Sequence, residues 1–126
     1  MSFGVITGVD GRRGLFFDPA EWFVGEDANA AAAEDGEIEP GGNVPNDYYI
    51  RDDERAEVLK RLDGNAVVVL STADRHNIPT PKCVTPRGFQ RAFRNPSPWE
   101  EGIRVSPYWL VERGGVVIRL VEQYLP

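Results

Sequence analysis

The stretch Tyr108-Trp109-Leu110-Val111-Glu112-Arg113-Gly114-Gly115-Val116-Val117-Ile118-Arg119-Leu120-Val121 decides the fold class. Two segments rich in β-branched and aromatic residues flank Gly114-Gly115, a dipeptide that adopts positive φ without steric cost. This pattern predicts a tight β-hairpin. Because apolar residues occupy both faces of the segment after the turn, we expect its strand to be half buried or central in the sheet.

Further strands are predicted along the rest of the chain. Segments 3–9 and 15–17 flank a turn at 10–14 and predict another hairpin, and 46–51 predicts a separate strand. The run 66–72 is apolar on both faces and predicts the central strand. A strand beginning near Ile103 is interrupted by Pro107, which lacks a backbone donor and therefore predicts an edge or a bulge.

Helices are predicted to be few and short. Asp18-Pro19-Ala20-Glu21 has the residue order of a capped helix start and predicts a helical turn through Trp22. An alanine-rich helix is expected from Glu26 to Glu34, with Gly36 ending it. The segment 55–62 has near-helical apolar spacing, but a strand returning to the sheet is the alternative there.

These elements predict one domain, 1–126, that is mainly β and α+β only at the margin. The favoured architecture is a small OB-like or related β-barrel of about six or seven strands, with one or two short helices over an open end. An antiparallel sheet backed by helices is the alternative.

Composition restricts the chemistry of the chain. Among 126 residues there is one cysteine, Cys83, and one histidine, His76, so we expect no disulfide, no metal site and no cofactor. The acidic segment 34–42 lacks the spacing of a calcium-binding loop and predicts a solvated linker. The N-terminus shows no signal peptide, which predicts a cytoplasmic protein, or a secreted one if the chain is a processed form.

Residues 75–94 differ in charge from the rest of the chain. Arg75, Lys82, Arg87, Arg91 and Arg94 lie there without one Asp or Glu, which gives +5 locally and leaves −11 for the remainder of a chain of net charge −6. Prolines and glycines predict a long basic loop or insertion over 73–102. Within it, the spacing of the last three arginines is that of a helical turn presenting three guanidiniums.

This stretch supplies the candidate ligand-binding residues, namely Lys82, Arg87, Phe89, Arg91, Phe93 and Arg94. Guanidinium groups bind phosphate or carboxylate through a planar bidentate fork, while the two phenylalanines either stack on a ligand or anchor the segment in the core. An acidic protein or a phosphorylated small molecule is favoured as partner over extended nucleic acid, because the net charge opposes a polyanion. Pairing of the arginines with the acidic remainder is the structural alternative.

Several strings in the chain resemble a family of small uncharacterised actinobacterial proteins, many of them secreted or lipid-anchored. They include Asn46-Asp47-Tyr48-Tyr49-Ile50-Arg51 and the C-terminal Glu122-Gln123-Tyr124-Leu125-Pro126. The resemblance covers most of the chain except 73–102, carries no established activity and implies a strand after Arg51.

No sequence motif of an enzyme is present. The chain lacks Gly-x-Ser-x-Gly, a phosphate-binding Walker loop and a dinucleotide fingerprint. We therefore expect a non-catalytic binding or interaction module contacting an anionic ligand or acidic protein through 75–94. The alternative is a small hydrolase using carboxylates near Asp47, with Asp18, Glu21, Asp52 and Asp53 as further candidates. An exposed edge at Pro107 would allow a homo-oligomer.

Overall fold

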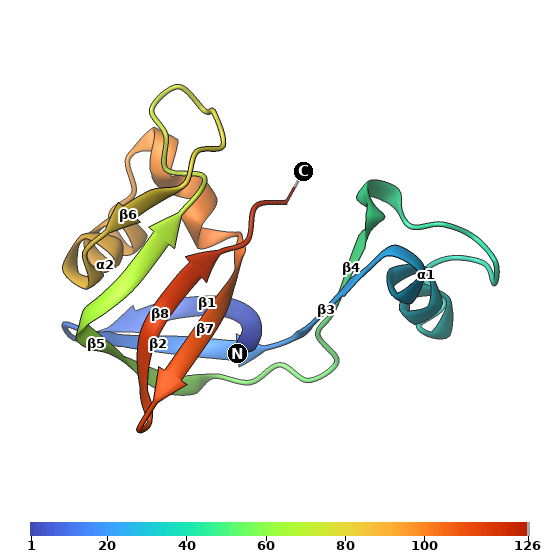
Figure 1. Ribbon diagram of the computed structural model, residues 1–126, viewed down its shortest axis with the longest axis horizontal. Helices are drawn as coiled ribbons and strands as arrows, with labels where there is room; N and C mark the ends of the chain where they lie inside the picture. Colours follow the sequence, from blue (N-terminus) through green and yellow to red (C-terminus); the bar gives the residue numbers. More distant parts are fainter. Residues whose placement is uncertain (126) are drawn as a thin grey trace. The chain divides into compact units, whose positions relative to one another are not determined.

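The computed structural model describes residues 1–125 and divides into two compact units (Figure 1). The first, termed the barrel unit, comprises residues 1–19 and 56–125. The second, termed the insertion, comprises residues 20–55.

The barrel unit contains six strands, one α-helix and one 3-10 helix. In chain order they are β1 (Ser2–Asp10), β2 (Gly14–Pro19), β5 (Val58–Leu70), β6 (Lys82–Val84), α2 (Pro86–Arg94), η2 (Pro98–Arg104), β7 (Pro107–Arg113) and β8 (Val116–Glu122). The insertion contains β3 (Glu21–Val24), α1 (Gly25–Glu34), η1 (Pro45–Asp47) and β4 (Tyr48–Arg51). Residues 1–125 thus form eight strands, six in the sheet of the barrel unit and two in a separate sheet in the insertion.

Five strands of the barrel unit form a closed barrel. The sheet has the order β2-β1-β7-β8-β5-β6, and pairing of β2 with β5 closes it, leaving β6 as an appended strand. β5 and β8 run parallel, whereas the other neighbouring pairs are antiparallel. The closed five-stranded barrel and its short helices confirm the predicted small β-barrel.

The Gly114-Gly115 turn joins β7 to β8 as predicted. Both glycines have positive φ, +59° and +84°, which is the requirement for a two-residue turn that matches strand twist. β8 was predicted to be half buried or central, and it lies inside the sheet between β7 and β5.

The question at 55–62 is settled in favour of a strand. β5 runs from Val58 to Leu70, pairing first with β2 and then with β8 and β6. The prediction at Ile103 is wrong, because that residue belongs to η2 and β7 begins only at Pro107. β7 lies between β1 and β8, so Pro107 starts an inner strand and offers no free edge.

The core fills the barrel and extends under α2. Its members are Ile6, Leu15, Phe17, Leu62, Ala66, Val68, Leu70, Ala73, Phe89, Ala92, Phe93, Ile103, Tyr108, Leu110, Val117 and Leu120. Tyr108 is fully buried, and its hydroxyl donates a hydrogen bond of 2.6 Å to the carbonyl oxygen of Ile103. Burial raises the pKa of this phenol well above its usual value, and the nearby Glu122 carboxylate adds to the effect.

The insertion is a two-stranded sheet with one helix. β3 pairs with β4, and the buried residues of α1 are alanines, Ala28, Ala31 and Ala32. Arg51 joins the elements, because its Nε donates to Asp35 at 2.9 Å and its Nη2 to the carbonyl oxygen of Ala31 at 3.2 Å. Gly36 was predicted to end α1, and it does: its φ is +75° and its N–H donates a hydrogen bond to the carbonyl oxygen of Ala33.

The helical turn predicted from Asp18 is wrong. Asp18 is buried, and its carboxylate accepts a hydrogen bond of 3.0 Å from the N–H of Ala56. The residues that follow form β3, whose Trp22 ring stacks on Tyr48 of β4 at a centroid distance of 5.0 Å. Strand pairing over a long sequence separation therefore overrides the local helix signal. No helix within residues 1–125 is long and apolar enough to cross a lipid bilayer.

Candidate anion-binding site

Helix α2 forms where the spacing of three arginines predicted a helical turn. Thr85 caps its start, because the Oγ1 atom accepts a hydrogen bond of 2.9 Å from the N–H of Gly88. Pro86 occupies the first helical position, where its missing N–H costs nothing. The region predicted as a long basic loop thus contains a capped helix belonging to the barrel unit.

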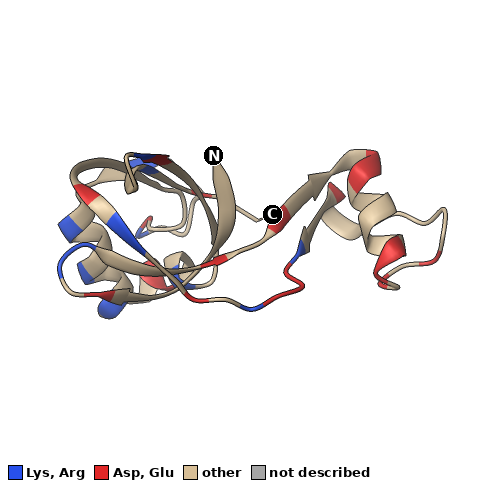
Figure 2. Cartoon of the chain, turned by 90° about the horizontal axis from the view of Figure 1, so that it is seen from below, with Lys and Arg blue, Asp and Glu red and all other residues tan. Residues whose placement is uncertain are grey.

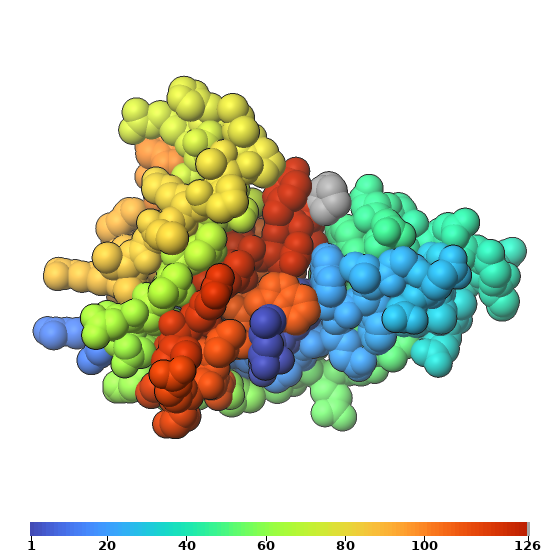
Figure 3. Space-filling model, in the orientation of Figure 1, coloured from blue at the N-terminus to red at the C-terminus, as the bar shows by residue number. Residues whose placement is uncertain are grey.

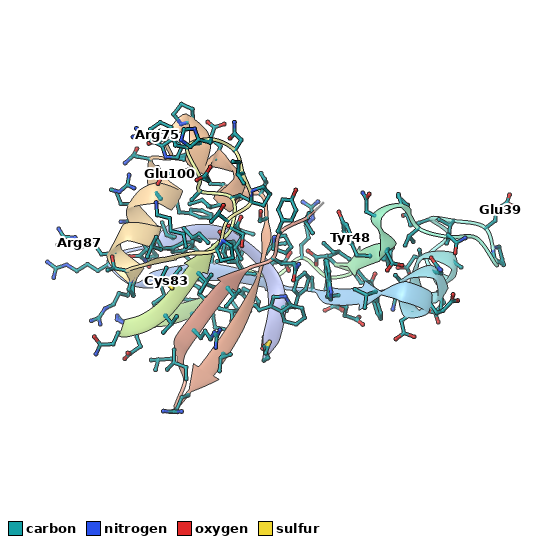
Figure 4. The ribbon with its side chains drawn as sticks, turned by 45° about the horizontal axis from the view of Figure 1, so that its top comes forward. Glu39, Tyr48, Arg75, Cys83, Arg87 and Glu100 are labelled. Atoms are coloured by element: carbon teal, nitrogen blue, oxygen red, sulfur yellow. The ribbon has the colours of Figure 1, made fainter. Side chains whose placement is uncertain are left out.

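The two faces of α2 differ in chemistry. Phe89 and Phe93 are buried in the core, and their rings contact each other at a centroid distance of 5.8 Å. Arg87 and Arg91, one turn apart, and Arg94 at the helix end point to the opposite side. Figure 4 shows Arg87 projecting outward from the helix. The phenylalanines therefore anchor the helix, and the arginines are presented to solvent.

The turn between β1 and β2 lies against this helix. The side-chain amide of Gln90 is buried and donates a hydrogen bond of 2.8 Å to the carbonyl oxygen of Gly14. The guanidinium of Arg94 donates to the carbonyl oxygen of Gly11. These two bonds hold the turn beside α2, so Arg12 and Arg13 come close to the helical arginines.

The turn and the helix enclose a hollow of about 620 Å³. Its lining residues are Arg12, Arg13, Gly64, Pro86, Arg87, Gln90, Arg91, Arg94 and Asn95. Five of these nine are arginines and none is acidic. In the space-filling view the turn, the middle of β5 and α2 meet at one margin of the barrel unit (Figure 3). We call this feature the arginine hollow.

Gly64 leaves room for Arg13 at the side of the hollow. A Cβ atom built on Gly64 would lie 2.5 Å from Nη1 of Arg13, a distance that real Cβ atoms do not show. The backbone is also tied there, because the N–H of Leu62 donates a hydrogen bond of 2.6 Å to the carbonyl oxygen of Arg13. A residue without a side chain thus lets a guanidinium lie directly on β5.

One carboxylate contacts the arginines from outside the lining. Arg91 pairs with Glu100 of η2 at 3.1 Å, and Ser97 donates its N–H to the same carboxylate at 2.9 Å. Burial disfavours the charged form of Glu100, but the hydrogen bonds from Ser97 and Arg91 outweigh it and hold the pKa below its usual value. Because the Arg91 side chain remains 60% exposed, its guanidinium stays accessible to a ligand.

The other predicted ligand-binding residues are distributed differently. Lys82 lies on β6 and does not line the arginine hollow. Arg75 lies on the loop after β5, with its guanidinium 4.9 Å from the centre of the Trp99 ring (Figure 4). Arg12 and Arg13 were missed as site residues, although two adjacent arginines in a glycine-flanked turn were a signal in the sequence.

The charges of the chain are segregated between the units. The insertion holds eleven of the twenty acidic residues but two of the fourteen basic ones, and therefore carries a formal charge of −9. Since the whole chain carries −6, the barrel unit carries +3. Figure 2 shows Lys and Arg concentrated in the barrel unit and Asp and Glu along the insertion.

Asp47, the centre of the hydrolase alternative, ends η1 in the insertion, is exposed and does not line the arginine hollow. Among residues 1–125, no three His, Cys, Asp or Glu side chains are grouped so that they could hold a metal ion.

Comparisons with known proteins add no relative. No protein-family model matches the chain, and neither the curated proteins nor the solved structures searched contain a match to it. The function is therefore inferred from the geometry and charge of the site.

Proposed function

We propose that this chain is a non-catalytic binding module that takes a multiply charged anion in the arginine hollow. The observation that carries the proposal is the set of five guanidiniums from two separate segments around one hollow without a lining carboxylate. Like charges in such proximity repel one another, and an anion between them removes that cost.

The chemistry of the lining favours phosphate groups. Guanidinium offers a planar fork that donates two parallel hydrogen bonds to a phosphate or carboxylate. The volume of about 620 Å³ exceeds what a single phosphate group would fill and is within the range of small-molecule sites. A ligand with several phosphate groups would meet arginines from both the turn and the helix.

Support also comes from the way the site is held. Phe89 and Phe93 fix α2 in the core, while Gln90 fixes the turn against α2. Binding therefore requires little ordering of backbone, which is the main cost of assembling a site from flexible segments.

The test is titration calorimetry with inorganic tripolyphosphate at low and high salt. Arg12→Ala/Arg13→Ala removes two charges from the hollow, and Arg113→Ala/Arg119→Ala is the matched control, because these exposed arginines do not line the arginine hollow. We expect the first variant to lose at least about tenfold in affinity and the control to change little. Equal losses in both variants, or no binding by the wild type, would contradict the proposal.

A further inference from the structure

The arginine hollow is continued by a second hollow on the other side of the β1–β2 turn. This hollow measures about 320 Å³ and is lined by Asp10, Gly11, Arg12, Arg13, Gly14, Leu59, Lys60 and Arg61. Arg12 and Arg13 line both hollows. Lys60 forms an ion pair with Glu112 at 2.8 Å, whereas Arg61 is exposed. A row of positive charge thus runs from α2 over the turn onto β5.

An apolar outer face lies next to this row. Phe16 of β2 and Leu59 of β5 are paired in register, and partners in antiparallel strands place their side chains on the same face. Leu15 and Phe17 point into the core, so Phe16 points outward and is partly exposed, while Leu59 is 59% exposed. Arg61 lies on the same face, opposite Gly14.

Glycines keep the ring of Phe16 accessible. Its partner on β1 is Gly8, and the position two residues before it on β2 is Gly14. A Cβ atom on Gly8 would lie 3.6 Å from Cδ2 of Phe16, so the ring lies along that residue without a side chain above it. The face therefore presents one aromatic ring and one leucine beside Arg61.

The segregation of charge removes the main objection to a polymeric anion. The net charge of −6 opposed extended nucleic acid, but the insertion contributes −9 and the barrel unit itself carries +3. A cationic unit with a row of arginines attracts a phosphodiester chain locally.

We infer that the anion bound by this protein is a short single strand of nucleic acid. Its phosphates lie along the arginine hollow and the second hollow, and an unstacked base lies on Phe16 and Leu59. The inference depends on the proposed function for the phosphate contacts and adds the base contact. Stacking on an aromatic ring is tolerant of sequence, because every base has a π-face, so we expect little sequence preference.

The experiment is fluorescence anisotropy with three labelled probes of the same length. They are single-stranded oligothymidylate, an abasic strand with the same backbone, and a duplex. The length of about 12 nucleotides lies within the range of about 4 to 16 that small single-strand-binding barrels cover. Unlabelled tripolyphosphate serves as competitor. The variants are Phe16→Leu, which keeps an apolar side chain, and Arg61→Ala, with Val105→Ala as control because Val105 is 78% exposed and lines neither hollow.

The expected result has three parts. The base-bearing strand binds at least about fivefold more tightly than the abasic strand, and Phe16→Leu removes that difference without weakening the abasic strand. Arg61→Ala weakens both strands but leaves tripolyphosphate binding unchanged, since the second hollow is used by the longer ligand. The duplex binds more weakly than the single strand, because its bases are stacked and unavailable.

Other results separate the two proposals. Equal affinity for the abasic and base-bearing strands would overturn the base contact and leave the anion site standing. A duplex that binds as tightly as the single strand would overturn it as well. Absence of binding by every probe, tripolyphosphate included, would overturn both the inference and the proposed function.

Discussion

The side-chain amide of Gln90 donates a hydrogen bond of 2.8 Å to the carbonyl oxygen of Gly14, which joins helix α2 to the β1–β2 turn. Gln90 is 2% exposed, so this bond is shielded from water. It sets the distance between the arginines of the helix and those of the turn, and the arginine hollow depends on both groups.

Replacing Gln90 by Met keeps the length of the side chain and removes the donor. The carbonyl oxygen of Gly14 would then lack this buried partner, which costs about 1 to 3 kcal/mol in the free energy of unfolding. Urea denaturation measures this loss. We also expect weaker tripolyphosphate binding by the folded variant, because the turn is no longer held beside α2. An unchanged affinity with reduced stability would show that Gln90 supports the fold but not the site.

Gly64→Ala tests how closely Arg13 must lie on β5. The new Cβ would meet only the flexible end of the Arg13 side chain, so we expect the stability to change little and the guanidinium to move. Affinity for tripolyphosphate should fall severalfold, as measured by calorimetry beside a thermal denaturation curve. A variant that binds as well as the wild type would show that Arg13 is not needed at its present position.

The pattern of residues predicted half of the site. The spacing of Arg87, Arg91 and Arg94 predicted a short helical turn that presents three guanidiniums, and helix α2 is present there, although its prolines and glycines had predicted a loop. Arg12 and Arg13 could not be joined to it from sequence, because the Gln90–Gly14 bond links residues 76 positions apart. Long-range hydrogen bonds of this kind leave no local signal.

The fold, like the site, could be predicted where local signals exist and not where long-range contacts decide the structure. The Gly114-Gly115 turn and the apolar run of β5 are local signals, and both led to the correct strands. The residues after Asp18 have a local helix signal, yet they pair with β4 across the insertion. The summed charge of −6 also conceals an insertion of −9 and a barrel unit of +3, because the division of the chain into units is not visible in the composition.

Neutralising exposed acids of the insertion should speed the binding of anions. Glu37→Gln/Glu39→Gln/Glu54→Gln changes the net charge of the chain from −6 to −3 without touching the arginine hollow. We expect a severalfold faster association with an oligophosphate at low salt, measured by stopped flow, because net repulsion falls. At high salt the difference should vanish. A slower association at low salt would contradict this account of the charges.

Glu100 makes the stability of the barrel unit sensitive to acid. A carboxyl group whose pKa is lower in the folded protein stabilises the fold above its unfolded pKa, and this stabilisation is lost as the pH falls through the folded value. The pKa of Glu100 lies below its usual value of 4.5, so we expect the loss to begin near that pH and to continue below it. Glu100→Gln should be less stable at neutral pH and should lose less on acidification.

Thermal denaturation of both proteins between neutral pH and about pH 3 measures the Glu100 effect. The two stability curves should converge as the pH falls. Curves that remain parallel over this range would show that the contacts of Glu100 with Ser97 and Arg91 do not stabilise its charged form.

The most direct test of the anion site is two-dimensional NMR of the arginine Nε–Hε groups during titration with tripolyphosphate. We predict that the signals of Arg12, Arg13, Arg87, Arg91 and Arg94 shift together and saturate, because these side chains line one hollow. The signals of Arg113 and Arg119, which lie outside it, should stay in place. Equal small shifts of all arginines without saturation would mean general ionic attraction and would contradict a specific site.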